Sequence, residues 1–488
     1  MVPILKYRKA FIWIMMAFSF LLLSLVWRSS TGLEGGQDSY MHYLFSRYSW
    51  DHPQLLLDQW GKPVFTLIAS PFCQFGIKGL VVFNMLCLIG SGYFSYASVK
   101  AFNFKMPELA FVIAVFAPIA FGRAISGLTE PLNGLLVAIM LYLFAKNKYK
   151  TAYIFASFMP FVRTEGFVIL GVVLLYLILR KHYKYLPYVL SGTLFYSIFG
   201  AIISGNPMWV IDENPYFKFQ SDGVLKLGNG PFLHYVNNLK SLWTFLLLVL
   251  TILASFFYSI KWLKDKKEAK YTYLMVLCFG IFFMYLMAHS TIYFLGILGA
   301  QGLLRVLMVT IPCVAVLCAA FVGEITSYVK PFALRLGSYL GLCIYLVYSS
   351  YVVNEYGLPG QDKVSITEEH IMGNLENTIS YIKENNLEDR MLVHQLPIID
   401  VYADKDPFIP GSEENAQSTN IWGILSEDDW LKKQHLVLWD GYHAPREGGV
   451  SLDFMKKSKR YKFLKKFSDE NSEHFKGHFD IYLFEKIE

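Results

Sequence analysis

The sequence predicts a polytopic α-helical membrane protein that carries a small α/β domain at its C-terminus. Of its 488 residues, 54% are hydrophobic and only 17% are charged, whereas a soluble domain carries about a quarter charged residues. Apolar runs such as 10–27 and 242–260 approach the roughly 20 residues that a helix needs to cross the hydrocarbon core. After residue 353 the composition becomes polar, and this change marks the second domain.

The predicted membrane spans follow the apolar runs in order, about eleven in total. They lie near 10–27, 79–99, 109–122, 128–145, 151–162, 167–179, 186–204, 242–260, 271–289, 303–322 and 334–353. Three of them (109–122, 151–162 and 167–179) are short for a crossing, so we expect them to be tilted, broken or partly re-entrant. Segment 10–27 is too long for the apolar region of a signal peptide and is interpreted as an uncleaved anchor.

Basic residues predict the orientation of these spans. Alternate short connections are rich in lysine and arginine, as in Lys146, Lys148 and Lys150, or in the five lysines between 261 and 270. By the positive-inside rule these connections are cytoplasmic. We therefore expect a multi-pass protein of a bacterial inner membrane, with a cytoplasmic N-terminus and an extracytoplasmic C-terminal domain.

Residues 1–353 form the predicted membrane module, which includes a long outer connection at 28–78. The aromatic runs 40–50 and 64–72 within this connection are too short to span. Tyrosine and tryptophan prefer the membrane–water interface, so both runs are predicted to be helices that lie in that interface.

Residues 354–488 form the predicted extracytoplasmic α/β domain. Residues 366–386 have helical spacing with acidic residues early in the run, and 391–395, 435–439 and 480–486 are predicted strands. The loop Trp439–Gly449 combines aromatic and polar side chains. It is interpreted either as an ordinary loop or as a segment that binds a sugar or covers the mouth of a reaction chamber.

Seven ionisable residues lie at the predicted outer ends of the apolar segments. They are Asp38, Arg123, Glu130, Arg163, Glu165, His289 and Arg305. Charge close to hydrocarbon is costly and is usually functional. A group with both signs on one face therefore predicts a reaction chamber there.

Asp38 lies in the segment Gly35-Gly36-Gln37-Asp38-Ser39-Tyr40, just before a predicted helix. One carboxylate can accept the proton of an acceptor hydroxyl while that oxygen attacks an electrophilic carbon. A phosphate leaving group departs without a general acid, so a single base suffices, unlike the carboxylate pair of glycoside hydrolysis. The alternative interpretation is that Asp38 caps the helix.

Arg123, Arg163 and Arg305 are candidate phosphate ligands, because a guanidinium binds phosphate oxygens bidentately and stabilises the charge of the leaving group. Glu130 and Glu165 are candidate substrate-binding residues as well. Alternatively, the glutamates pair with the arginines to tie helix ends together, and Arg305 extends to the lipid headgroups. Both interpretations remain open for each residue.

His289 is a candidate substrate contact, although a lone histidine near an interface is more often a packed, hydrogen-bonded residue. His42, Asp51, His52 and Asp58 lie in the same outer connection as Asp38, but their spacing is not diagnostic of a metal site. We therefore expect no metal and no other cofactor; a divalent metal is possible but unsupported.

The order of several short motifs resembles the GT-C superfamily of integral-membrane glycosyltransferases, especially the polyprenyl- or dolichyl-phosphate-mannose-dependent mannosyltransferases. The motifs are GGQDSYMHY at 35–43, WGKPVF at 60–65, SGLTEPL at 126–132, RTEGF at 163–167 and GAQGLLR at 299–305, with a proline at 312. The resemblance covers residues 1–353, and the tail is similar to the extracytoplasmic domains that many such proteins append.

The resemblance implies transfer of a sugar from a polyprenyl-phosphate donor to an acceptor hydroxyl at the outer face, with Asp38 as the base. The implied partners are the lipid-linked donor, membrane lipid, and a glycan, lipid or protein acceptor. No nucleic-acid partner is expected, because the net charge of +6 is spread over loops. Some members have two adjacent acidic residues where this chain has Gln37 and Asp38, and this departure favours a metal-independent reaction.

A transporter or flippase for a lipid-linked or anionic solute is the alternative function. It shares the many spans and the arginines. Such a protein is expected to show inverted repeats and polar residues at mid-bilayer depth, whereas here the charges cluster at one end of the spans.

Overall fold

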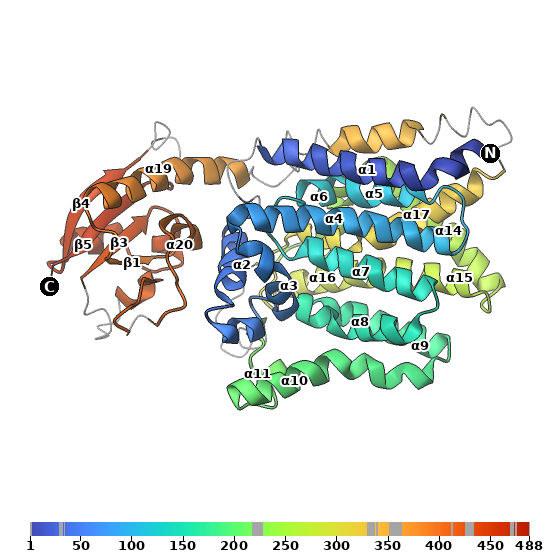
Figure 1. Cartoon of the computed structure of the whole chain (residues 1–488), viewed down its shortest axis with the longest axis horizontal. Coiled ribbons are helices and arrows are strands. Elements are labelled where there is room, and N and C mark those ends of the chain that lie inside the picture. The colour runs from blue at the N-terminus through green and yellow to red at the C-terminus, as the bar shows by residue number, and fades with distance from the viewer. Residues whose placement is uncertain are drawn as a thin grey trace. The chain divides into compact units, whose positions relative to one another are not determined.

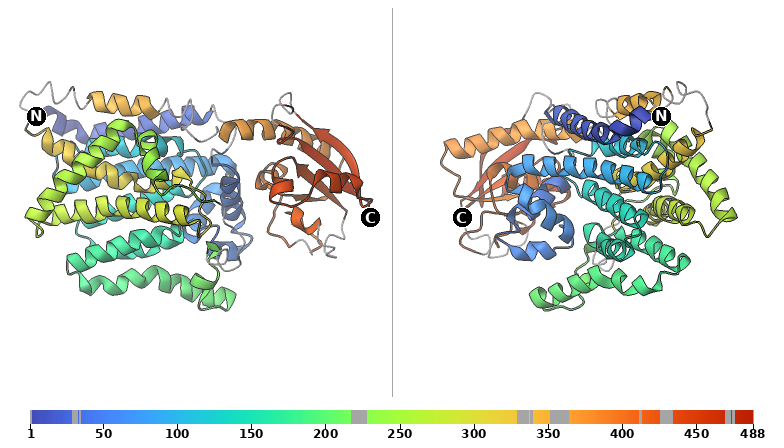
Figure 2. Two further views of the ribbon diagram at one scale, coloured as in Figure 1. Left: turned by 180° about the vertical axis from the view of Figure 1, so that it is seen from behind. Right: turned by 45° about the vertical axis from the view of Figure 1, so that its right-hand side comes forward.

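The computed structural model divides into two compact units, and each is described by itself. The first contains Met1–Ser29 and Pro53–Gln361, and the second contains Ser30–His52 and Asp362–Glu488. Placement is described for residues 2–28, 33, 35–216, 228–328, 337, 340–350, 364–410, 413–424, 434–468, 473 and 476–487. The first unit is a bundle of helices, and the second is a small sheet with helices, as Figures 1 and 2 show.

Most helices of the first unit coincide with the predicted spans. The helices of this unit are α1 (Val2–Arg28), η1 (Pro53–Leu57), α3 (Pro63–Cys73), α4 (Gly76–Ala101), α5 (Glu108–Phe116), α6 (Pro118–Gly122), α7 (Glu130–Ala145), α8 (Tyr149–Val162), α9 (Gly166–Leu179), η2 (Tyr183–Leu190), α10 (Ser191–Ser204), α11 (Trp209–Asp212), α13 (His234–Trp243), α14 (Phe245–Lys264), α15 (Ala269–Thr272), the π-helix η3 (Tyr273–Phe279), α16 (Gly280–Leu295), η4 (Leu304–Thr310) and α17 (Ile311–Ile325). Of these, η1, α3, α11 and most of α13 lie outside the predicted spans. A further helix covers Leu340–Ser350, within the last predicted span. The predicted fold class, a polytopic helical membrane protein, is confirmed.

Among the described residues, six helices or continuous helical runs are long and apolar enough to cross a membrane. They are Ala10–Arg28, Gly76–Ala101, Tyr183–Ser204, Phe245–Lys264, Ala269–Leu295 and Leu304–Ile325. Trp13, Ile202 and Phe256 expose 64%, 73% and 69% of their surface, as expected for side chains that face lipid tails. By contrast, α17 packs against α4, α5 and α7, and its residues form the interior of the bundle.

The short span predicted at 109–122 is broken, as expected. Helix α5 ends at Phe116, Ala117 is extended with ψ 130°, and Pro118 begins α6. A proline has no backbone N–H and disfavours the helical conformation of the residue before it. The break therefore has a local cause, and it turns the chain towards the connection that carries Arg123.

The second unit contains a five-stranded sheet in the order β2-β1-β3-β5-β4. Its elements are α2 (Gln37–Tyr48), α19 (Val364–Glu384), β1 (Met391–His394), α20 (Pro397–Ala403), β2 (Ser418–Asn420), η5 (Ile421–Ile424), β3 (His435–Asp440), α21 (His443–Arg446), α22 (Leu452–Lys457), β4 (Tyr461–Phe467) and β5 (Ile481–Lys486). Strand β1 pairs in parallel with β2 and β3, whereas β5 is antiparallel to β3 and β4. The helix and the three strands predicted in the tail are confirmed; β2 and the lysine-rich edge strand β4 were not predicted.

Helix α2 belongs to the second unit although it lies near the N-terminus. The whole connection 28–78 was predicted to belong to the membrane module, but α2 packs against α20 of the tail. The Tyr48 hydroxyl donates to the backbone oxygen of Lys405 at 3.1 Å, and the ring of Phe45 lies 5.0 Å from that of Phe408. The run 40–50 is therefore helical as predicted, and its aromatic side chains serve this packing.

Candidate active site

Glu130 is the centre of a buried ion-pair network at one end of the helical bundle. It begins α7, where Pro131 follows it in the first turn, and its side chain is only 1% exposed. Its Oε1 lies 3.0 Å from Nη1 of Arg163 and 3.4 Å from Nε of Arg305. A buried carboxylate requires compensating charge, and these two arginines supply it.

Arg163 is held by several acceptors at once. It follows the last residue of α8 in an extended conformation, and its Nη2 donates to Oε1 of Glu165 at 2.9 Å. Its Nη1 also donates to Oγ1 of Thr129 at 2.8 Å. The planar guanidinium thus joins the ends of α7, α8 and α9, which agrees with the structural interpretation of this arginine.

Glu165 and His289 complete what we call the Glu130 network (Glu130, Arg163, Glu165, His289 and Arg305). Glu165 lies in the turn between α8 and α9, outside both helices. Burial by itself raises the pKa of Glu165, but Arg163 and His289 outweigh it and lower the pKa to about 2. His289 Nε2 is 3.9 Å from Oε1 of Glu165, which is too long for a hydrogen bond, and its ring packs 4.7 Å from that of Tyr285.

The network gathers five of the seven residues that the sequence singled out. Their positions at the ends of several helices were predicted to fall on one side of the bundle, and the ion pairs show that they do. Arg123 lies just after α6, a helix that packs against η4, the element that carries Arg305. Asp38 belongs to the second unit.

Asp38 lies inside the first turn of α2 and is half-buried. The cap of this helix is Gly36, with φ 72° and no side-chain hydrogen bond. The alternative interpretation of Asp38 as the capping residue is therefore wrong. An acidic side chain in a first helical turn still interacts favourably with the helix dipole.

Gln37 has a separate role. Its Oε1 accepts a hydrogen bond of 3.4 Å from the backbone N–H of Ile398 in the first turn of α20. This contact links the start of α2 to the start of α20, and it thereby fixes the segment that carries Asp38. This hydrogen bond gives a structural reason for a glutamine at position 37.

Lys62 is a candidate site residue that was not predicted from the sequence. It is 6% exposed, has φ 66° and precedes α3. Its Nζ donates to the backbone oxygen of Gln59 at 3.1 Å and to the Tyr216 hydroxyl at 3.4 Å. Among the described residues no carboxylate lies within ion-pair distance of this ammonium group. The only sequence signal was its place in the WGKPVF motif.

No group of three or more histidine, cysteine, aspartate or glutamate side chains that could hold a metal ion occurs among the described residues. His52, one of the histidines considered in the first connection, instead pairs with Asp406 at 2.7 Å. The residues considered there as metal ligands are therefore not gathered into a site.

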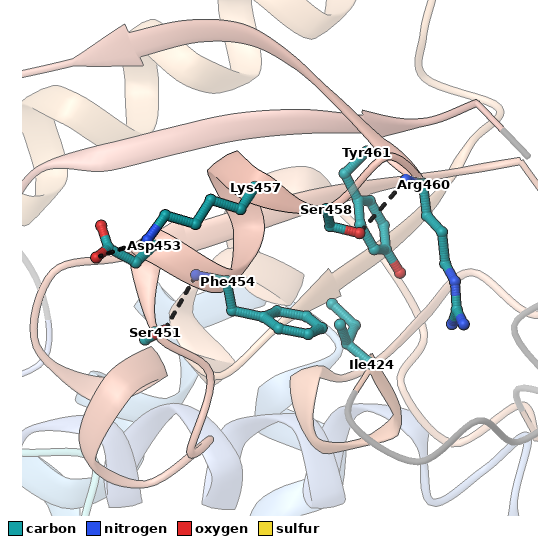
Figure 3. A pocket seen from close by; sticks show the side chains of 8 residues that line it. All are labelled: Ile424, Ser451, Asp453, Phe454, Lys457, Ser458, Arg460 and Tyr461. Carbon is teal, nitrogen blue, oxygen red and sulfur yellow. Dashed lines mark hydrogen bonds and ion pairs between the residues drawn. The ribbon is translucent and has the colours of Figure 1, made fainter.

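A cavity of about 570 Å³ in the second unit is lined by residues of η5, α22 and β4, which Figure 3 shows. Several polar groups that line the cavity form local hydrogen bonds or an ion pair. Ser451 Oγ accepts from the backbone N–H of Phe454 at 3.1 Å, Ser458 Oγ accepts from that of Arg460 at 3.3 Å, and Asp453 pairs with Lys457 at 3.8 Å. We therefore do not assign a substrate to this cavity.

Comparison with known proteins identifies the fold. No family model and no curated protein matches this chain. The crystal structure of ArnT from Cupriavidus metallidurans bound to undecaprenyl phosphate matches with a TM-score of 0.59 and 10% sequence identity, over 97% of this chain and 98% of that chain. At this identity the similarity concerns the fold alone, and the chain shares the fold of that protein over nearly its whole length.

Proposed function

We propose that this protein is a membrane glycosyltransferase that moves a sugar from a polyprenyl-phosphate donor to an acceptor hydroxyl. The observation that carries the proposal is the GT-C fold, which the chain shares over nearly its full length with a protein crystallised with undecaprenyl phosphate. Buried charges at one end of an apolar bundle support it, because such charges are usually retained for function.

The donor phosphate is assigned to Lys62 and Arg305 rather than to Arg163. Arg163 already donates hydrogen bonds to Glu165 and Thr129 and forms an ion pair with Glu130, so a phosphate would have to displace a carboxylate. Lys62 is buried and donates to two neutral oxygens, while Asp58 acts on it only from beyond ion-pair distance. Burying an ammonium group without a directly paired anion is costly, and a phosphate oxygen would supply that direct partner. Arg123 is assigned a secondary role at the same phosphate.

Asp38 is assigned as the general base. It accepts the proton of the acceptor hydroxyl while that oxygen forms a bond to the anomeric carbon. The bond from this carbon to the phosphate oxygen breaks, and the polyprenyl phosphate leaves with the electron pair. A direct displacement of this kind inverts the anomeric configuration. The cationic groups stabilise the negative charge of the leaving phosphate.

The finer assignments are also part of the proposal. We infer that the donor sugar is a hexose, with mannose the first candidate from the family resemblance, and that the reaction needs no metal. The basic connections favour a cytoplasmic N-terminus and an extracytoplasmic tail in a bacterial inner membrane. Retained activity in EDTA, and transfer from polyprenyl-phosphate mannose in preference to other polyprenyl-phosphate hexoses, would support these assignments.

The test is release of polyprenyl phosphate from its mannose conjugate by the purified protein, with a bacterial membrane extract as the source of acceptor. Asp38→Asn should lower the rate by at least about a hundredfold without changing the thermal midpoint. Asp51→Asn is the matched control, since Asp51 is exposed in the same connection. Equal rates for both variants would remove Asp38 as the base. Movement of the lipid-linked sugar across proteoliposomes without its transfer would instead favour the transporter.

A further inference from the structure

The sheet of the second unit has a topological switch point between β1 and β3. The chain leaves β1 through α20 to reach β2 on one side, and it later returns to β3 on the other side of β1. Both neighbours run parallel to β1, so the carboxyl ends of these strands lie at one edge. In open α/β sheets, ligands bind outside the carboxyl ends of the strands at this point.

Two segments flank the switch point. Gln395 follows β1, and the loop Gly441–Gly449 follows β3. This loop is built around Asp440, whose carboxylate accepts hydrogen bonds from the backbone N–H groups of Tyr442 and Ala444 at 3.0 and 3.1 Å. Trp439 Nε1 donates to the backbone oxygen of Val450 at 2.7 Å, which closes the loop. The side chains that the loop presents are therefore held by a defined backbone.

The loop directs polar side chains towards Gln395. His443 Nδ1 lies 3.1 Å from Oε1 of Glu447, and this hydrogen bond lowers the pKa of Glu447, with further help from the Gln395 side chain. The Oε1 atom of Gln395 is buried and accepts no hydrogen bond from the described residues. A buried acceptor without a donor is costly unless a ligand or water supplies one.

Asp38 lies beside the group formed by Gln395, His443 and Glu447, within the second unit. Gln37, its neighbour, bonds to Ile398 near the start of α20, three residues after Gln395. The negative charge of Asp38 acts on Glu447 and opposes the effect of His443 on its pKa. Asp38 and Glu447 therefore approach each other from segments that lie far apart in the sequence.

We infer that Gln395, His443 and Glu447 form the acceptor-binding subsite next to Asp38, and that this subsite takes a neutral, hydroxyl-rich group such as a sugar. Hydroxyl groups donate to the two carboxylates and to Gln395 Oε1, whereas a phosphate would meet repulsion from the two carboxylates. The inference rests on the proposed function, because it names the acceptor side of the same reaction.

The experiment measures binding of methyl glucoside, methyl galactoside, methyl mannoside and their 6-phosphates to the purified full chain by saturation-transfer NMR. A neutral glycoside should bind, and its phosphate should bind at least about tenfold more weakly. Glu447→Gln and Gln395→Leu should each weaken binding about tenfold, the usual effect of losing one hydrogen bond to a buried or charged group. Asp453→Asn, at an exposed carboxylate of the same unit, should leave it unchanged.

Undecaprenyl phosphate binding by the same preparations separates this inference from the proposed function. Glu447→Gln should bind the lipid phosphate as the wild type does. A wild type that does not bind the lipid contradicts the proposed function, while the saccharide measurements still decide the acceptor subsite. The inference is overturned if no neutral glycoside binds, if the phosphates bind equally well, or if Glu447→Gln binds glycosides like the wild type. Glu447 is largely exposed, so its substitution should not impair folding.

Discussion

Arg163 Nη1 lies 3.0 Å from Oε1 of Glu130, and the two side chains are 13% and 1% exposed. The same carboxylate lies 3.4 Å from Nε of Arg305. One glutamate therefore connects the start of α7, the end of α8 and the start of η4. Two arginines around one carboxylate make its charge essential to the packing of these helix ends.

Glu130→Gln should destabilise the protein by about 3 kcal/mol, because it leaves two arginines buried without their shared anion. The thermal midpoint in detergent, followed by intrinsic fluorescence, measures this loss. Adding Arg163→Met to Glu130→Gln should recover part of it, since the uncompensated cation is then also removed. Asp453→Asn, at an exposed ion pair, should change stability by no more than about 0.5 kcal/mol. An unchanged midpoint in Glu130→Gln would contradict the structural role of the network.

Lys62→Met should weaken binding of undecaprenyl phosphate by roughly 10- to 100-fold, since a hydrogen bond from a charged donor to the phosphate is lost. The fold should persist, because methionine fills the volume of the lysine stem and removes a costly buried charge. The matched control is Lys78→Met, at an exposed lysine in the first turn of α4. Equal affinities of the two variants would exclude Lys62 from the phosphate site.

The free energy of unfolding should fall in acid, because the Glu165 carboxylate then takes up a proton. Because the pKa of Glu165 is lowered to about 2 in the folded protein, its stabilising contribution is complete above the ordinary carboxyl pKa of about 4.5. It is lost progressively as the pH falls from there towards 2, where the folded-state carboxylate takes up its proton. Thermal midpoints between pH 7 and 3 should therefore fall more steeply for the wild type than for Glu165→Gln. Parallel pH profiles would show that Glu165 is not held in its ionised form.

Asp406→Asn should loosen α2 from the tail. Its carboxylate lies 2.7 Å from Nε2 of His52 and accepts from the backbone N–H of Phe408 at 2.9 Å. Losing the charged hydrogen bond should raise deuterium exchange in residues 37–48. Asp404→Asn is the control, because Asp404 is exposed and has φ 51°, a conformation that asparagine tolerates. Faster exchange in both variants, or in neither, would argue against this contact as the link.

Much of the architecture could be predicted because it depends on local composition. The spans follow from apolar length, the break within 109–122 from the short length of that segment, and the central strands β1, β3 and β5 from buried runs. The edge strand β4 was missed because its lysines obscure the apolar alternation. Strand β2 was missed because three residues carry too little pattern.

The candidate site residues likewise include some features that the sequence could predict and some that it could not. The positive-inside rule placed Glu130, Arg163 and Arg305 at one end of the bundle without any knowledge of their partners. It did not indicate that Glu130 is shared by both arginines. Lys62 gave no signal beyond a short motif, because its burial depends on residues such as Tyr216 that lie far away in the sequence.

The sequence by itself determined the membrane class, the order of helices and the end of the bundle at which charges gather, since hydropathy and charge bias act within a single segment. Only the tertiary structure decided which charges pair, that α2 packs with the tail, and that Asp38 approaches Glu447. These relationships join residues that are distant in the chain. They arise because buried charges and hydrogen-bonding groups must find partners wherever the packing of the helices and the sheet brings them together.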